Sequence, residues 1–380
     1  MSAPLVILAT GGTGGHMFPA EALASALLER GVRLAVITDR RGEAFAGALA
    51  SVERHQIRSG GIAGKGLVGR LVSIRELALG LFEARALLQR LAPRVVVGFG
   101  GYASAPTVLA ASLARCRTLI HEQNAVLGRA NRLLANRVDR IATSFPDVRQ
   151  VPAKAAGKVI RTGMPLRPAF IAARAIDYPR HTLSSRFNLL VLGGSQGARV
   201  FSDCVPAAIA LLPSPAREAL RISQQCRPED VERVRAAYAV LGVQADLATF
   251  FADIPDRLAA AHLVVARSGA STVAEITGVG RPSILVPYPF ATDDHQSANA
   301  AALADVSAAW MISQSALTPE GLAARLERVW QAPETLAAAA AQARAAGQPD
   351  ATARLSALVG TMLGADETGS QNGENGRKAA

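Results

Sequence analysis

Short apolar runs alternate with segments of helical periodicity along the first 145 residues of the chain. The apolar runs have the length of buried strands and cover residues 5–8, 34–38, 95–97, 118–120 and 141–143. Helical patterns lie over 20–30, near 42–50 and over 71–92, where apolar residues recur mostly three or four positions apart. This alternation predicts a doubly wound α/β fold, in which helices connect the strands of a parallel sheet.

The alternation stops over 146–188, which holds five prolines, and restarts with a strand and a glycine-rich loop at 187–199. Further strands are predicted near 220–223, 246–250, 262–266 and 283–287, and helices over 319–331, 333–346 and 350–363. We therefore predict two Rossmann-like parallel-sheet domains that face a central cleft. They cover 1–163 and 164–345, followed by a C-terminal helix over 346–364 that could cross back to the first domain, and a polar, disordered tail over 365–380.

Composition narrows the class of protein. Half of the residues are hydrophobic, as in a globular chain with a large aliphatic core, and no run approaches the ~20 apolar residues that a membrane helix needs. The first residues lack the basic segment of a signal peptide. Three scattered cysteines favour a reducing cytoplasm without a disulfide framework.

The positive charge lies in the first half of the chain. Residues 1–163 carry 22 Lys and Arg against 10 Asp and Glu, a net charge of +12, whereas the rest carries 19 against 20, a net charge of −1. A one-sided basic surface attracts nucleic acid, anionic lipid headgroups or phosphorylated substrates. Plain solubility is the alternative explanation.

Gly11 to His16 link the first predicted strand to the next helix. Four glycines let the backbone turn tightly and approach another molecule closely. Free backbone N–H groups and the positive end of a helix dipole suit a diphosphate or a developing negative charge. The spacing is not the G-x-G-x-x-G of dinucleotide-binding loops. His16 adds a titratable group, and the alternative is a tight turn with an incidental histidine.

Other candidate segments also follow strands, where open α/β sheets bind their ligands. Residues 98–104 form another glycine loop, which carries the hydroxyl group of Tyr102. A second polar segment comprises His121, Glu122, Gln123 and Asn124. Four polar residues in a row are poor core material, so we expect a site there. Residues 193–197 form a further glycine loop, in which Ser195 could cap the following helix.

Residues 267–271 join a predicted strand to a helix that begins near Ser271, and backbone N–H groups there could bind phosphate oxygens. Glu275 lies about one turn further along and could accept two hydroxyl protons from a ribose diol. The alternative is a first-turn glutamate favoured by the helix dipole. Residues 293–296 could meet sugar hydroxyls. Two acids beside His295 also suit a metal, but no third ligand is spaced to match, so we predict neither a metal nor a cofactor.

A membrane-surface patch is predicted at the loop 59–70 and the adjoining helix 71–92. Basic residues beside exposed apolar side chains bind an anionic bilayer by charge and shallow insertion. The residues concerned are Lys65, Leu67, Arg70, Leu79 and Phe82. The alternative is that the apolar stripe of this helix packs on the sheet.

Five motifs, in this order and spacing, resemble the MurG-type glycosyltransferases: GGTGGH, GFGGYAS, HEQN, GGSQGAR and RSGASTVAEI. The resemblance implies a two-domain GT-B fold and inverting transfer of N-acetylglucosamine from UDP-N-acetylglucosamine. The acceptor would be the 4-hydroxyl of the muramoyl unit of lipid I (undecaprenyl-diphospho-muramoylpentapeptide), and the product lipid II of peptidoglycan synthesis. The resemblance also implies a peripheral protein at the cytoplasmic face of the inner membrane, with cell-wall synthesis proteins as candidate partners.

The resemblance further implies a role for individual residues. His16 is the favoured general base, and the ordinary pKa of histidine suits proton removal from an acceptor hydroxyl. The implied substrate-binding residues are Thr13, Gly14 and Gly15 for the donor sugar or acceptor diphosphate, Asn124 for the N-acetylglucosamine, Arg167 and Ser195 for the UDP phosphates, Phe251 beside the uracil, Ala270, Ser271, Thr272, Val273, Ala274 and Glu275 for the nucleotide, with Glu275 on the ribose, and Gln296 for sugar hydroxyls. Further candidates are Tyr102, His121, Glu122 and His295.

Two competing functions follow from the same features. A UDP-sugar 2-epimerase, or a GT-B transferase with another acceptor, would use similar glycine loops. A nucleic-acid-binding protein would explain the basic first half. The sequence lacks a helix-turn-helix signature, RNP-type aromatics and a zinc module, so we expect no nucleic acid as partner.

Overall fold

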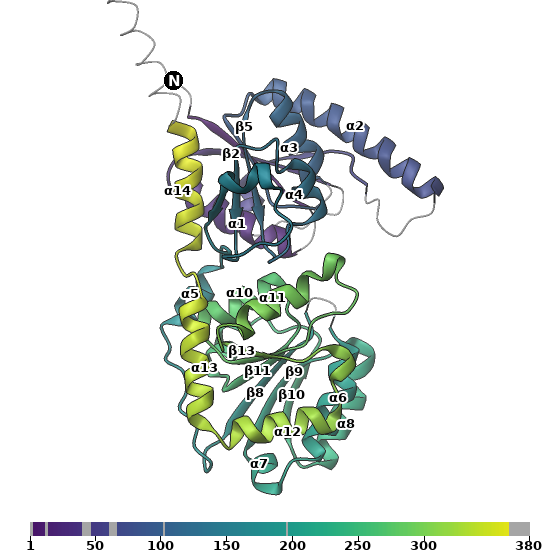
Figure 1. The fold of residues 1–380 in the computed structure, drawn as a ribbon, viewed down its shortest axis with the longest axis vertical. Helices are drawn as coiled ribbons and strands as arrows, with labels where there is room; N and C mark the ends of the chain where they lie inside the picture. The colour runs from purple at the N-terminus through teal and green to yellow at the C-terminus, as the bar shows by residue number, and fades with distance from the viewer. Residues whose placement is uncertain are drawn as a thin grey trace, which may run out of the picture. The chain divides into compact units, whose positions relative to one another are not determined.

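The computed structural model describes residues 3–11, 14–39, 47–60, 67–101, 103–194 and 197–364. They form two units, one of residues up to Pro165 together with Asp350–Gly364, and one of Leu166–Pro349 (Figure 1). The boundaries predicted after residues 163 and 345 lie close to these limits. Several features named from the sequence lie outside the described residues: Thr13, Tyr102, Ser195, the tail 365–380, and residues 61–66 of the predicted membrane-surface loop, which include Lys65.

The first unit contains a parallel sheet with the strand order β3-β2-β1-β4-β5-β6-β7. The strands are β1 (Leu5–Ala9), β2 (Arg33–Thr38), β3 (Glu53–Gln56), β4 (Val95–Gly98), β5 (Arg117–Glu122), β6 (Arg140–Thr143) and β7 (Val159–Arg161). The central strands are apolar along their whole length because helices cover both faces of the sheet. The apolar pattern of the sequence does not indicate β3 and β7, the two edge strands, because they are short and mostly exposed.

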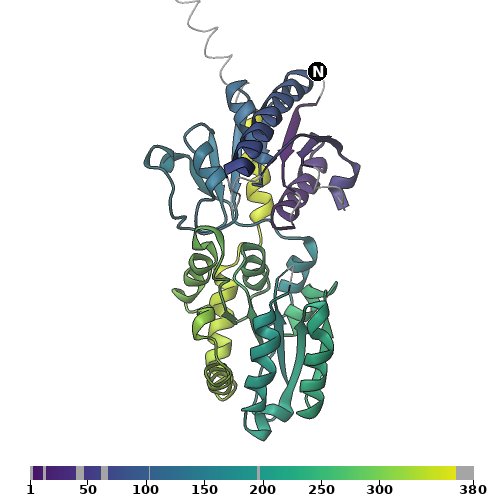
Figure 2. The ribbon, with the colours of Figure 1, turned by 90° about the vertical axis from the view of Figure 1, so that its right-hand side faces the viewer.

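Helices on both sides of this sheet complete the first unit. They are α1 (Gly14–Leu28), α2 (Leu67–Leu91), α3 (Ser104–Leu113), α4 (Arg129–Leu134) and α14 (Ala351–Gly364). The C-terminal helix α14 packs against α1, and its Leu355, Val359 and Met362 join the core on that face (Figures 1 and 2). The prediction of a helix over 20–30 was wrong about its start, since α1 begins at Gly14 and contains Pro19.

The helix predicted near 42–50 lies partly outside the described residues. Its described part is a short 3-10 helix over Gly47–Ser51. The prediction of a long helix over 71–92 is confirmed, with α2 beginning four residues earlier, at Leu67. Within the described ranges, no helix is both long and apolar enough to cross a membrane.

The second unit contains a parallel sheet with the strand order β10-β9-β8-β11-β12-β13. Its strands are β8 (Phe187–Leu192), β9 (Leu220–Gln225), β10 (Gln244–Ala248), β11 (Leu263–Ala266), β12 (Ser283–Leu285) and β13 (Ala309–Met311). Only β13, another short edge strand, was not predicted. The repeated doubly wound pattern is therefore confirmed in both units.

Helices cover both faces of the second sheet as well (Figure 1). On one face, α6 (Arg199–Ala210), α8 (Val231–Val240) and α12 (Pro319–Trp330) enclose the main core. The other helices are α5 (Pro168–Arg174), α7 (Ser214–Ala219), α9 (Ile254–Ala260), α10 (Ala270–Val279), α11 (His295–Ala304) and α13 (Pro333–Ala346). Among these, α5 packs against α9 and α10, and α10 also packs against α11 and α13.

Candidate active site

The strand order of each sheet fixes where a ligand site is expected. In the first unit the order reverses between β1 and β4, and in the second between β8 and β11. Helices leave such neighbouring strands in opposite directions, so the carboxyl ends of the two strands stay open to a ligand. Three of the four loops at these points are glycine loops from the sequence analysis, and the fourth leads into α10.

In the first unit, the glycine loops after β1 and β4 lie backbone against backbone. Gly11 donates a hydrogen bond to the carbonyl of Gly100 at 3.2 Å. Gly101 has φ +79°, and a Cβ there would lie 2.7 Å from the Cα of Gly11. Gly100 has φ +90°, and a Cβ there would lie 2.9 Å from Cε1 of His16. The absence of side chains thus brings the imidazole of His16 directly over this backbone.

His16 is in the first turn of α1, not in a loop before it as predicted. Burial lowers the pKa of His16, and interactions with the Phe99 carbonyl and the Gln123 side chain offset this in part. The positive end of the α1 dipole also opposes protonation. His16 is therefore neutral at pH 7, which is the state that a general base requires. No described residue gives its buried Nδ1 a hydrogen-bond partner.

A second buried histidine lies close to His16. Nε2 of His121 is 3.0 Å from the carbonyl of Gly163, so this nitrogen carries the proton, and Nδ1 accepts a hydrogen bond from Gln123 at 3.3 Å. Burial lowers the pKa of His121 to about 4. Gln123 also donates to the Phe99 carbonyl at 2.8 Å. His121 and Gln123 thus form a fixed, uncharged layer below His16. No local pattern in the sequence indicates this role of Gln123.

Glu122 organises the loop that carries Asn124. Its carboxylate accepts hydrogen bonds from the backbone N–H groups of Asn124 and Gly128 at 3.0 and 2.9 Å. It also accepts from the side-chain amides of Asn124 and Asn131 at 3.3 and 2.8 Å. Glu122 is 2% exposed, and burial raises its pKa against the effect of these donors. Its contacts orient the amide of half-buried Asn124, the residue of this segment that could reach a ligand.

In the second unit, Arg167 and Glu275 come together beside the N-terminal half of α10. Arg167 precedes α5, and its Nη2 lies 3.9 Å from Oε1 of Glu275. Burial raises the pKa of Glu275 to about 7, although the Arg167 charge lowers it. The Glu275 carboxylate has few hydrogen-bond donors within the protein, so it could accept from a ligand hydroxyl. The neighbouring Arg167 could bind a phosphate of the same ligand.

The helix α10 begins at Ala270, one residue from the predicted start, after Gly269 at its N-cap. Val273 donates its N–H to the carbonyl of Gly269 at 2.9 Å, and its side chain is buried. The N–H groups without an intrahelical acceptor in this turn are therefore those of Ala270, Ser271 and Thr272. Val273 supports the turn, whereas these three offer donors to an anion.

The loop before α10 is tied to the start of α11. Ser268 donates to the carbonyl of Gln296 at 2.8 Å, and Asn299 donates to the carbonyl of Ser268 at 2.9 Å. Oε1 of Gln296 accepts the N–H of Tyr288 at 3.0 Å. His295 donates Nδ1–H to the carbonyl of Thr292 at 2.8 Å, which fixes its ring. Gln296 thus lies near the α10 N-terminus, and its amide nitrogen points away from Tyr288.

Phe251 lies further along the same sheet edge. It follows β10, which is separated from β11 by β9 and β8, so the two strand ends are about 14 Å apart. The ring of Phe251 is buried, and the guanidinium of Arg257 covers it at 3.9 Å. Phe251 thus follows the edge strand of the sheet, apart from the strand end that leads into α10, and Arg257 covers its ring.

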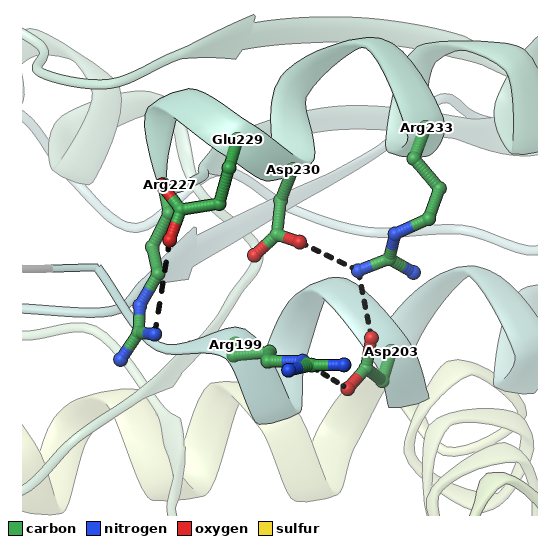
Figure 3. A network of polar contacts seen from close by, with 6 residues as sticks. All are labelled: Arg199, Asp203, Arg227, Glu229, Asp230 and Arg233. Carbon is green, nitrogen blue, oxygen red and sulfur yellow. Dashed lines mark hydrogen bonds and ion pairs between the residues drawn. The ribbon is translucent and has the colours of Figure 1, made fainter.

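A network of charged residues joins α6, which follows the glycine loop after β8, to α8 (Figure 3). Arg233 on α8 binds Asp203 on α6 and Asp230, with both distances at 2.7 Å. At the end of the loop, Gly197 has φ +68°, and a Cβ there would lie 3.2 Å from the backbone nitrogen of Arg227. Gly197 thus lets the described residues next to α6 pack closely on the backbone that follows β9.

Comparison with known proteins agrees with these features. A Paramagnetospirillum magneticum protein named UDP-N-acetylglucosamine–N-acetylmuramyl-(pentapeptide) pyrophosphoryl-undecaprenol N-acetylglucosamine transferase is 58% identical over 356 residues, which is 94% of this chain and 96% of that protein. The crystal structure of Acinetobacter baumannii MurG is 30% identical, covers 94% of this chain and 99% of its own, and has a TM-score of 0.77. The UDP-GlcNAc 2-epimerase of Neisseria meningitidis has a TM-score of 0.66 at 10% identity, covering 94% and 99%, and thus shares the fold alone.

The two parallel-sheet units and these matches define the class of protein: a glycosyltransferase with the GT-B fold. The chain belongs to glycosyltransferase family 28, whose N-terminal domain matches residues 6–143 and whose C-terminal domain matches residues 188–355. The fold and the family expected from the sequence motifs are both confirmed.

Proposed function

We propose that this protein transfers N-acetylglucosamine, with inversion, from UDP-N-acetylglucosamine to the 4-hydroxyl of the muramoyl unit of lipid I, and so forms lipid II. The names of relatives that are 58% and 53% identical support this choice. The epimerase alternative has weaker support, because the epimerase neighbour shares only 10% of its residues with this chain.

The observation that carries the proposal is the pair of Arg167 and Glu275 beside the N-terminus of α10. When the bond between sugar and phosphate breaks, negative charge grows on the departing diphosphate. The Arg167 guanidinium and the open N–H groups of α10 would stabilise that charge, and preorganised donors of this kind are effective because they need no reorganisation. Ionised Glu275 would accept the ribose hydroxyl protons, and Gln296 would bind the donor sugar.

In the first unit, His16 would act as the general base. It would take the proton of the 4-hydroxyl as the oxygen attacks the anomeric carbon from the face opposite UDP, which inverts the configuration. The neutral state of His16 suits this role, because its lone pair is available at pH 7. Asn124, oriented by Glu122, would contact the N-acetylglucosamine.

The helix α2 would supply the contact with an anionic membrane surface. Its exposed face carries Phe82, 69% exposed, between Arg75 and Arg85, which helical spacing places on the same side. Val72, 54% exposed, lies near the same stripe, whereas Leu79 is half-buried. This arrangement supports a peripheral protein that contacts an anionic membrane surface. The cytoplasmic face, where lipid I would be its substrate, is the location that the family resemblance implies.

A transfer assay tests the reaction. Labelled UDP-N-acetylglucosamine is incubated with a short-chain lipid I analogue and, separately, without an acceptor. We expect label in the lipid and UDP release that depends on the acceptor. Donor turnover without an acceptor would instead identify an epimerase or a hydrolase, and bound donor with no turnover in either reaction would contradict the acceptor assignment.

Co-sedimentation with anionic vesicles tests the membrane contact. Phe82→Glu should release most of the protein from vesicles, because it removes an apolar anchor and adds a negative charge. Val240→Glu is the matched control, since Val240 is 87% exposed on α8 of the other unit. Equal binding by both variants would refute the role of α2, and tight DNA binding at physiological salt without vesicle binding would favour a nucleic-acid partner.

A further inference from the structure

Arg281 is a wholly buried arginine that joins three helices of the second unit. It is 1% exposed, and its guanidinium donates hydrogen bonds of 2.7–3.3 Å to main-chain carbonyls. These carbonyls lie in the last turn of α9, at the end of α10 and just beyond α5, at Leu258, Ala259, Val279, Gly280, Ile176 and Asp177. One side chain thus satisfies the carbonyls that helix ends leave open.

The charge of Arg281 is stabilised by the same helix ends. Burial lowers the pKa of Arg281 to about 10, so the side chain is still charged at neutral pH. The C-terminal end of a helix carries partial negative charge, and three such ends point at this guanidinium. Arg281 therefore fixes the C-terminal ends of α5, α9 and α10 relative to one another.

Arg174, the last residue of α5, adds a second connection. Its Nη1 donates to the carbonyls of Gly278 and Thr277 at 2.9 and 3.3 Å, both in the last turn of α10. Its Nη2 donates to the carbonyl of Arg344 on α13 at 2.8 Å, and Arg344 donates back to the carbonyl of Arg174 at 2.6 Å. The end of α5 is therefore bound to two neighbouring helices.

The other end of α5 carries the proposed donor-binding arginine. A Cβ on Gly278 would lie 2.4 Å from Cδ1 of Leu166, so the absence of a side chain lets the residue before Arg167 approach α10 closely. The helix α5 has seven residues and spans about 10 Å. Because so short a helix is rigid, fixing its last turn on α10 also fixes where Arg167 stands relative to Glu275.

We propose that Arg174 and Arg281 are positioning residues for the donor site: they brace α5 against α10 and so hold Arg167 beside Glu275. The inference rests on the proposed function, in which Arg167 meets the UDP phosphates. The brace would preorganise the site, so that less ordering of α5 and of the Arg167 side chain has to occur when the diphosphate binds.

A double-mutant cycle on donor binding tests the brace. Arg174 is preferred to Arg281 because it is only half-buried, so its replacement endangers the fold less. The dissociation constant of UDP-N-acetylglucosamine is measured by calorimetry for wild type, Arg174→Met, Arg167→Met and the double variant. We expect Arg174→Met to weaken binding about tenfold in the wild-type background, and by less than about twofold once Arg167 is absent, since coupled residues are not additive.

The matched control is Arg221→Met. Arg221 also donates to two carbonyls of the second unit, those of Leu220 and Glu218, but has no contact with α5 or α10 among its hydrogen bonds. This control should leave donor binding within about twofold of wild type. Arg174→Lys keeps the charge and one donor group, so it should fold like wild type and bind the donor with an intermediate constant.

Two results would overturn the brace: unchanged donor binding by both folded Arg174 variants, or additive losses in the double variant. These results differ from a failure of the proposed function. If wild type itself does not bind UDP-N-acetylglucosamine, both the proposed donor site and the brace are refuted. If wild type binds normally but the losses are additive, only the brace is refuted. Thermal melting of each variant identifies any loss that comes from unfolding.

Discussion

Replacing Glu275 by glutamine should stabilise the second unit while weakening donor binding. Burial raises the pKa of Glu275 from its ordinary value of 4.5 to about 7, because the Arg167 guanidinium at 3.9 Å compensates only part of the lost hydration. The carboxyl group is 17% exposed, so little solvent screening reduces this effect. A shift of this size corresponds to about 3 kcal/mol between folded and unfolded states.

The sign of the pH dependence follows from the direction of the shift. The folded state keeps the proton of Glu275 to a higher pH than the unfolded state does, so stability falls as pH rises from 4.5 to about 7. Glutamine is nearly isosteric and stays neutral. At pH 8 Glu275→Gln should therefore be more stable than wild type by up to about 3 kcal/mol, a rise of several degrees in the melting temperature. Near pH 4.5 the difference should almost disappear.

Chemical unfolding at pH 8 and pH 5, with donor calorimetry at pH 8, checks both halves of the prediction. Donor affinity should fall about tenfold or more, because the proposed acceptor of the ribose hydroxyls loses its charge. Glu232→Gln is the control, since its carboxylate is 84% exposed and lies outside the site. A variant that is less stable than wild type at pH 8, or equally stabilised at both pH values, would refute the reasoning.

Three further predictions concern the histidines and the glycine loops. His16→Ala should lower turnover by ~10²–10⁴-fold with little change in donor binding. Steady-state kinetics measures the turnover and calorimetry the donor binding. A loss of donor binding would show that His16 is a binding residue and not the base. Gly101→Ala should destabilise the first unit by about 1–3 kcal/mol in chemical unfolding, because φ is +79° and the new Cβ would meet Gly11. Gly157→Ala is the control, since a Cβ there meets nothing within 4 Å. Equal losses of stability in the two variants would contradict this account. Burial lowers the pKa of His262 from 6.5 to about 4, helped by the charges of His181 and Arg281, and its Nδ1 accepts the N–H of Asn188 at 2.9 Å. The free energy of unfolding should therefore fall by up to about 3 kcal/mol as pH drops from 6.5 to 4, and the fall should be smaller in His262→Gln. Identical pH profiles of stability in wild type and variant would contradict this role of His262.

The sequence predicted the sheets well because their central strands are continuous apolar runs, and it missed edge strands such as β3, which is mostly exposed and polar. The start of α1 was misplaced because Gly14, Gly15 and Pro19 all disfavour a helix. In the structure the helix nevertheless begins at Gly14, and His16 in its first turn packs on Gly100.

The polar segment after β5 shows a second limit of what can be predicted from the sequence. A run of four polar residues predicted a site, yet His121 and Glu122 are wholly buried and bound within the protein. A ligand site and a buried hydrogen-bond network use the same residue types, so only the partners distinguish them. For Glu122 the partners include Asn131, nine residues further along, and no local pattern indicates it. The same holds for Arg281, whose acceptors lie up to 105 residues away.

The two units use the same topological position for different electrostatics. In the first, His16 stands over an uncharged layer of His121, Gln123 and glycine backbone, which keeps its lone pair free. In the second, Arg167 and the α10 N-terminus offer positive charge. Under the proposed function, His16 accepts a proton and Arg167 stabilises a leaving diphosphate, so exchanging their surroundings would impair both. Both arrangements occur where the strand order reverses, because a doubly wound sheet leaves its strand ends uncovered only there.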